Sequence, residues 1–209
     1  MDLKQLGWVA AAGLAAFVCT AARHAPGGKC GVIDIARVFK DCDFSKIQSE
    51  KLRAVGESRS ELLAFMENYR VLSADQASKL RALYMKSPQA DADRAELDRL
   101  KKEIQEADQA FKSLQTKPSP TPEEVAKLQE LNTRSQLTAS LGDRWAKEFN
   151  DEVQNLNETL RNETLSRLRE AVRDVGKKKG YNLLFTREAS PYGANDVTDD
   201  ALKAMNSRK

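Results

Sequence analysis

Apolar residues recur at steps of three to seven along most of the chain, which is the spacing of amphipathic helices. The longest uninterrupted stretch of this spacing runs from Thr121 to Lys178. It predicts a single helix of about 58 residues and about 87 Å, at 1.5 Å per residue. The apolar seam of this helix consists of Leu137, Leu141, Trp145, Phe149, Val153, Leu156, Leu160, Leu165, Leu168, Val172 and Val175.

The step along this seam predicts how the helix packs. Successive seam residues lie 3.8 positions apart on average, more than the 3.5 of a left-handed coiled coil. We therefore expect a straight or slightly right-handed rod rather than a leucine zipper. Trp145 and Phe149 lie on the seam, so we interpret them as packing residues rather than as part of a ligand site.

Three breaks precede the long helix. Ser73 and Gln76 match the capping box that starts a helix, and Ser87-Pro88 interrupts the pattern again. A further helix is predicted over residues 91–114. Three prolines then fall within 118–122, and no helix continues through them.

Two of these breaks belong to a weak repeat with an offset of 31 residues. Lys86, Asp93, Ala95, Leu97 and Leu100 correspond to Lys117, Glu124, Ala126, Leu128 and Leu131. The pattern indicates a duplicated helix start. Two copies are too few for a solenoid.

Strand signals flank the helices. Cys30–Ile35 is rich in β-branched residues, and Tyr181–Thr186 changes from helical to two-fold periodicity. A turn is expected at Ser190–Gly193. Thr198 is predicted to cap a short final helix whose first turn contains acidic residues.

This order of elements predicts an α+β fold that is mostly α. Residues 29–44 and 176–209 are assigned to a small β body and residues 45–175 to a protruding helical arm, segmented near 73, 87–88 and 117–122.

A helical hairpin would bring both strands to one end, but two or three short strands are not stable alone in water. We therefore expect an obligate oligomer whose chains pool their strands and cover the exposed edges. The residues expected at this interface are Val32, Ile33, Ile35, Phe39, Leu183, Leu184, Phe185 and Tyr192.

Composition agrees with long helices and argues against several functions. Ala, Glu, Lys, Leu and Arg provide 100 of the 209 residues, a usage typical of coiled coils or long helices. The only histidine is His24, and no hydrolase, kinase or dinucleotide-binding motif is present. We predict no enzymatic activity, cofactor or metal. The 34 basic and 31 acidic residues are too balanced to indicate a nucleic-acid partner.

The amino terminus has the order of a secretory signal. Lys4 precedes an apolar run from Leu6 to Val18, and small residues follow at positions 20–22. The run is short for a membrane span, which needs roughly 20 residues. Residues 1–22 are therefore predicted to be a signal peptide, with an uncleaved anchor as the alternative. After export, Cys30 and Cys42 could form a disulfide or remain separate thiols, and we favour the latter.

Two charge clusters are candidate sites. Asp91, Asp93, Glu96 and Asp98 lack the glycine turn of an EF-hand, so we interpret them as a solvated helix face with local ion pairs. The stretch from Arg161 to Arg187 has eight basic and three acidic residues. Its cations could contact an anionic surface such as lipid headgroups, or simply follow the helix dipole. The proposed basic patch comprises Arg169, Arg173, Lys177, Lys178 and Lys179.

Both ends of the chain resemble the Skp (OmpH-like) family of periplasmic chaperones. Lys29–Phe39 is similar to the opening strand of that family and its turn into the first helix. Gly180–Met205 is similar to its closing segment, through the strand at 181–185, Pro191-Tyr192 and the run Asn195–Asp199. The arm between them matches only in its helical, charged character.

The resemblance implies a homotrimer whose β body carries three helical arms around a cavity. Such proteins hold unfolded outer-membrane proteins in the periplasm without ATP, and an anionic lipid or lipopolysaccharide is a further expected partner. One departure concerns the arm. Its residues 73–125 carry nine basic and ten acidic side chains, whereas the best-known members have strongly basic arms. The alternative is a non-catalytic coiled-coil spacer of the cell envelope.

Overall fold

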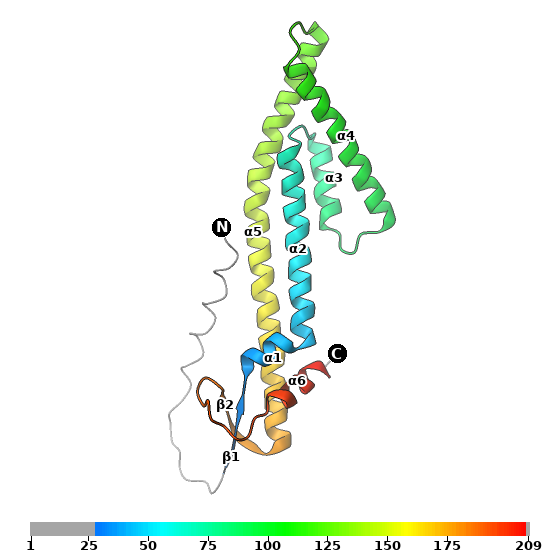
Figure 1. The fold of residues 1–209 in the computed structure, drawn as a ribbon. Coiled ribbons are helices and arrows are strands. Elements are labelled where there is room, and N and C mark those ends of the chain that lie inside the picture. The colour runs from blue at the N-terminus through cyan, green and yellow to red at the C-terminus, as the bar shows by residue number, and fades with distance from the viewer. Residues whose placement is uncertain (1–27, 208–209) are drawn as a thin grey trace.

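The computed structural model describes residues 28–207, so the predicted signal peptide lies outside the described residues. Figure 1 shows a long helical arm above a small body that holds the two strands. The elements are β1 (Lys29–Ile33), α1 (Ile35–Asp41), α2 (Asp43–Asn68), α3 (Ala74–Met85), α4 (Asp91–Gln115), α5 (Pro122–Lys179), β2 (Tyr181–Thr186) and α6 (Thr198–Asn206). The prediction of a mostly helical α+β fold is confirmed. Within the described chain, no helix is both long and apolar enough to cross a membrane.

The sequence sets both ends of α5, which has 58 residues. At its start, Thr121 Oγ1 accepts a hydrogen bond from the Glu124 backbone N–H (3.3 Å), and the Glu124 carboxylate accepts one from the Thr121 N–H (2.9 Å). At its end, Gly180 adopts a left-handed φ of 71°, which glycine reaches without a steric penalty. This turn directs the chain into β2.

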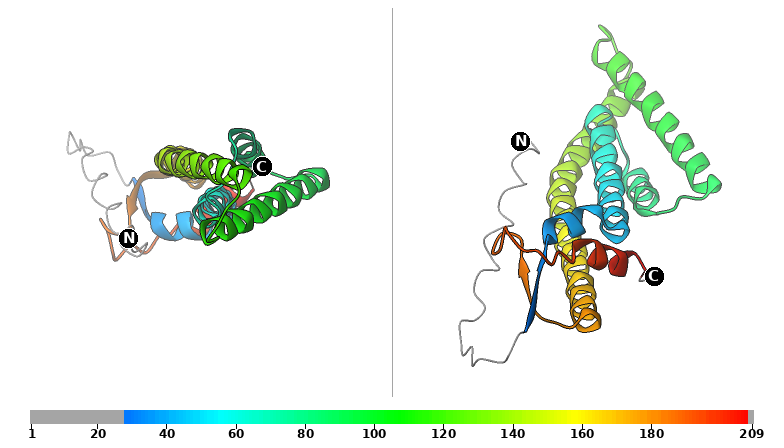
Figure 2. Two further views of the ribbon diagram at one scale, coloured as in Figure 1. Left: turned by 90° about the horizontal axis from the view of Figure 1, so that it is seen from above. Right: turned by 60° about the horizontal axis from the view of Figure 1, so that its bottom comes forward.

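The arm is more than a two-helix hairpin. α2 runs away from the body, α3 turns back beside it, and α4 rises obliquely to the tip, from which α5 returns (Figures 1 and 2). The predicted capping box starts α3, where Ser73 Oγ accepts from the Gln76 N–H (3.2 Å) and the Gln76 side chain accepts from the Ser73 N–H (3.0 Å). The distal part of the arm therefore contains four helical segments.

The repeat with an offset of 31 residues is visible in the contacts. Lys86 pairs with Asp93 in the first turn of α4, and Lys117 pairs with Glu124 (2.6 Å) in the first turn of α5. The Asp93 carboxylate also accepts from the Ala90 backbone N–H (3.2 Å), as the Glu124 carboxylate does from Thr121. Both helices thus begin with the same arrangement of lysine, acidic residue and backbone N–H.

The two strands meet at one end of the chain as a parallel pair. Their register aligns Cys30 with Leu183 and Ile33 with Thr186. On the other side of β1, the Val32 N–H donates to Asn195 (2.8 Å) and the Val32 carbonyl accepts from the Val197 N–H (2.9 Å). β1 therefore lies between β2 and the segment before α6, and this pairing forms within a single chain.

Apolar side chains form two separate cores. The base core joins β1, α1, α6 and the end of α5, and includes Ile33, Val38, Leu168, Val197 and Met205. The arm core joins α2, α3, α4 and the middle of α5, and includes Leu62, Leu80, Ile104, Leu131, Trp145 and Phe149. Between them α2 and α5 form a two-helix stalk, in which Leu52, Val55, Val153 and Leu156 are only half-buried.

One local prediction was wrong. Thr198 is the first residue of α6 rather than its cap, and Val197 occupies the cap position. Asp196 provides the capping oxygen, since its Oδ1 accepts from the Thr198 N–H (2.9 Å) and hydroxyl (2.5 Å). The Thr198 hydroxyl oxygen accepts from the Asp34 N–H (2.9 Å), so it links α6 to the end of β1.

Candidate functional site

The residues predicted at an oligomer interface divide into two groups. Val32 and Ile33 are buried by their own chain, and Ile35 and Leu184 pack partly buried against the base core. Phe39 is half-buried. Leu183 and Phe185, by contrast, are 57% and 41% exposed, and Tyr192 is 99% exposed.

The exposed group has a simple geometric origin. Side chains alternate along a strand, so Leu183 and Phe185 share the face of β2 opposite Leu184, whose side chain faces the base core. In the described sheet, β1 is the only strand paired with β2. We call Leu183, Phe185 and Tyr192 the β-end residues. The two strand residues lie beside an edge whose backbone groups are open to a further strand.

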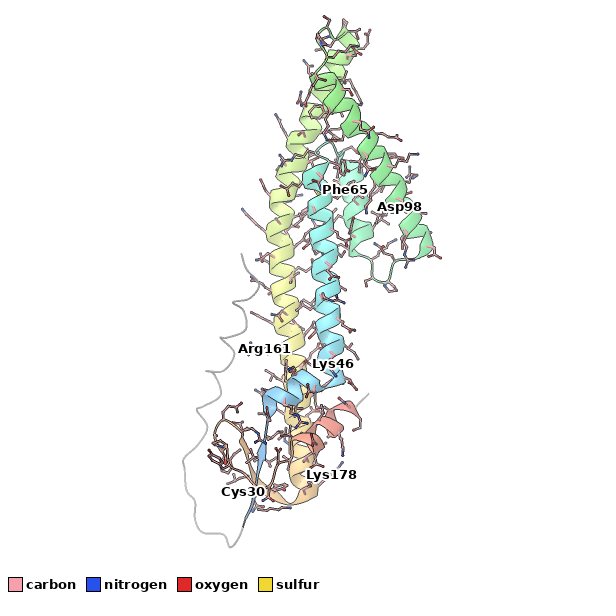
Figure 3. The ribbon with its side chains drawn as sticks, viewed as in Figure 1. Cys30, Lys46, Phe65, Asp98, Arg161 and Lys178 are labelled. Carbon is pink, nitrogen blue, oxygen red and sulfur yellow. The ribbon has the colours of Figure 1, made fainter. Side chains whose placement is uncertain are left out.

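The predicted basic patch lies on the last turns of α5. Arg169, Arg173, Lys177 and Lys178 are exposed, and Lys179 pairs with Asp200 of α6. Figure 3 shows Lys178 at the end of the molecule that also holds Cys30. The negative end of the α5 dipole favours the three lysines of the last turn, Lys177–Lys179. The structure brings the patch and the β body to the same end of the chain.

The acidic cluster of α4 forms local ion pairs. Asp91 pairs with Arg94 (3.3 Å), and Glu96 pairs with Arg99 (2.5 Å). The Lys86 ammonium holds the pKa of Asp93 below its ordinary value through a hydrogen bond, and Arg99 does the same for the pKa of Glu96. The described residues contain no group of three or more His, Cys, Asp or Glu side chains that could hold a metal ion.

The two cysteines of the described chain are free thiols. Cys42 is buried in the base core, and its Sγ lies 3.8 Å from the Phe39 carbonyl oxygen. Cys30 is exposed on β1. The separate-thiol interpretation therefore describes this structure.

Sequence reasoning missed a groove in the arm, which we call the arm groove. Met85 and Arg81 of α3 line one side, and Leu137, Leu141, Arg144 and Trp145 of α5 line the other. The groove holds about 470 Å³, within the range of small-ligand sites. The only signal in the sequence was that the Leu137–Trp145 seam needed a partner. The sequence pattern does not show that α3 folds back to provide this partner, because its position depends on tertiary packing.

Comparison with known proteins places this architecture in a family. A family model described as "Outer membrane protein (OmpH-like)" matches residues 29–205, which includes β1, the whole arm, β2 and nearly all of α6. Neither the curated proteins nor the solved structures gave a match. Because the family model covers most of the chain, from the first strand to the last helix, the protein belongs to the OmpH-like family of periplasmic chaperones.

Proposed function

We propose that this protein is an ATP-independent holdase, which binds unfolded outer-membrane proteins in the periplasm and prevents their aggregation. Family membership supports a periplasmic, chaperone-like role in general terms. The observation that carries the specific proposal is the separation of the two cores. The arm has its own apolar core and projects from the body on a two-helix stalk (Figure 1). Because the stalk and the arm stand clear of the body, their outer surfaces are available to a client.

The surface of the arm suits weak, repeated binding. Ile47 on α2 and Val125 and Leu137 on α5 are exposed apolar residues within a surface of local ion pairs. Unfolded membrane strands expose alternating apolar side chains and aggregate in water. Many weak apolar contacts on several linked arms hold such a chain by multivalency while leaving it unfolded.

The proposed assembly is a homotrimer built at the strand end. Leu183 and Phe185 expose apolar area beside the open edge of β2, and a further strand from a sister chain would cover both. Three arms then leave one body and surround a shared cavity. The β-end residues provide this interface in the proposal.

The basic patch of Arg169, Arg173 and Lys177–Lys179 is proposed to contact anionic lipid or lipopolysaccharide headgroups. Its position at the strand end leaves the arms directed away from such a surface. Co-sedimentation with vesicles containing anionic lipid, which should weaken with added salt, tests this part separately. Salt-independent binding, or none, would contradict it.

The holdase proposal is tested by light scattering. A denatured outer-membrane β-barrel protein is diluted from urea into buffer with or without the full chain, in the absence of ATP. We expect scattering to fall in proportion to the added chain until the clients are bound. A chain that leaves the scattering unchanged would instead fit the spacer alternative. A long-helical protein without family resemblance, at equal mass concentration, controls for crowding.

A further inference from the structure

The floor of the arm groove is apolar and partly open. Leu137 is 37% exposed, and Met85 and Leu141 are half-buried where they pack on the arm core. The floor is therefore continuous with the core, and an apolar side chain placed on it would extend the packing of α3 against α5. Burying this exposed area would favour binding by the hydrophobic effect.

A buried tryptophan is part of the groove lining. Trp145 is 3% exposed and lines the groove, yet its indole Nε1 has no hydrogen-bond partner. Among the buried side-chain nitrogen and oxygen atoms of the described residues, it is the only one in this state. A buried indole N–H normally finds an acceptor. This nitrogen is itself shielded from solvent, so the indole contributes apolar surface to the groove rather than a donor that a ligand can reach.

The rim of the groove carries an excess of positive charge. Arg81 of α3 and Arg144 of α5 both pair with Glu148, at 2.7 and 3.6 Å. Two guanidinium groups thus share one carboxylate. The Arg81 guanidinium also lies 4.9 Å from the centre of the Trp145 ring. Because its side chain is part-exposed, an anion at the rim can approach it.

We propose that the arm groove binds a short extended segment of an unfolded polypeptide that carries an apolar side chain next to an acidic one. The apolar side chain rests on Leu137 and its neighbours, and the carboxylate pairs with the rim arginines. The charge excess selects an acidic segment over a basic one. This inference rests on the proposed function, because its ligand is an unfolded client, and it adds the sequence preference of one subsite.

Tryptophan fluorescence gives a direct readout. The chain has two tryptophans, Trp8 and Trp145, so the full chain carrying Trp8→Phe reports on the groove alone. The probes are two blocked ten-residue peptides of alternating leucine and serine with either one glutamate or one lysine at the centre. We expect saturable changes in Trp145 emission. The acidic peptide should bind about fivefold more tightly, a difference that one partly exposed ion pair can supply.

Matched variants separate the groove from the general surface. Arg144→Gln should abolish the preference for the acidic peptide. Arg53→Gln should keep it, because Arg53 also pairs with a glutamate four residues later at 3.6 Å but lies on the stalk. Leu137→Ser should weaken both peptides about fivefold. Val125→Ser should not, although Val125 is on the same helix and equally exposed (38% against 37%).

Two results would overturn the inference: emission that neither peptide changes, and identical peptide preferences in the Arg144→Gln and Arg53→Gln proteins. Circular dichroism confirms that each variant folds. Aggregation assays on the same proteins distinguish the two levels. Suppressed scattering without peptide binding would contradict the proposed peptide site and support the holdase activity. Peptide binding without suppressed scattering would contradict the holdase activity and support the peptide site.

Discussion

Arg59 of α2 and Glu152 of α5 form a two-point ion pair, with Nη2 2.7 Å from Oε1 and Nε 3.1 Å from Oε2. The remaining Nη1 donates to the Tyr84 carbonyl of α3 at 3.2 Å. Arg59 is only 8% exposed. One side chain therefore joins three helices at the boundary between the stalk and the arm core, where α3 ends.

Replacing this arginine should loosen the arm. Arg59→Met keeps the apolar stem but removes three hydrogen bonds and leaves Glu152 without the cation that is hydrogen-bonded to it. We expect the free energy of unfolding to fall by about 2 kcal/mol, measured by urea denaturation followed by circular dichroism. Arg53→Met is the control, since the Arg53–Glu57 pair is exposed and should contribute less than about 1 kcal/mol. Equal losses in the two variants would contradict the role of Arg59.

The same pair predicts sensitivity to acid. The hydrogen bonds from Arg59 lower the pKa of Glu152 below its ordinary value of 4.5. A carboxyl with a lowered folded-state pKa contributes stability that is complete above its unfolded value and is lost as the pH falls through the folded value. Glu152→Gln should therefore reduce the dependence of Tm on pH below 4.5. In an Arg59→Met background the same change should have a smaller effect, because only the charge of Arg81 then lowers this pKa. An undiminished effect would assign the acid sensitivity to other groups.

Local signals predicted the helix limits because each depends on a few neighbouring residues. The capping box at Thr121 and the left-handed Gly180 define α5 without any tertiary information, and Ser73 with Gln76 does the same for the start of α3. The cap of α6 was missed because Asp196 and Thr198 are both capping residues by type. Their hydrogen bonds depend on where β1 places the Asp34 N–H.

The arm groove could not be predicted for a different reason. The seam placed Trp145 among packing residues, and the structure confirms that it is buried. Whether α3 folds back beside α5 depends on the turn at 69–73 and on the contacts of Tyr84 with α2. An unpaired indole N–H is a property of that packing. No spacing in the sequence encodes it.

Gly193 is expected to tolerate no side chain. A Cβ at this position would lie 1.9 Å from Cγ2 and 2.9 Å from Cβ of Val32, so the loop before α6 would have to move away from β1. Gly193→Ala should destabilise the base by about 2 kcal/mol, seen as a lower Tm. Ala194→Ser tests whether the effect comes merely from changing this loop. A normal Tm for Gly193→Ala would show that the loop can shift freely.

Two other glycines should behave in the opposite way. Gly56 in α2 and Gly142 in α5 lie within helices, and a Cβ at either would meet nothing within 4 Å. Alanine is favoured over glycine in a helix interior by about 1 kcal/mol. Gly56→Ala and Gly142→Ala should therefore each raise the Tm. If either lowers it, a sister chain or another part of the assembled protein occupies that space.

The proposed assembly predicts the mass of the protein in solution. Leu183 and Phe185 lie on one face of β2 and are exposed in the single chain, at 57% and 41%. Leu183→Ser with Phe185→Ser removes apolar area from the proposed interface without touching the base core. Light scattering coupled to size exclusion should show a change from about three times the chain mass of 23.3 kDa to a single chain.

Ile47→Ser is the control, because Ile47 is as exposed (61%) but lies on the stalk, and its variant should keep the larger mass. If the double variant also keeps it, the chains associate through another surface. If the unchanged protein is already a monomer, the strand end is complete in one chain and the shared cavity does not form.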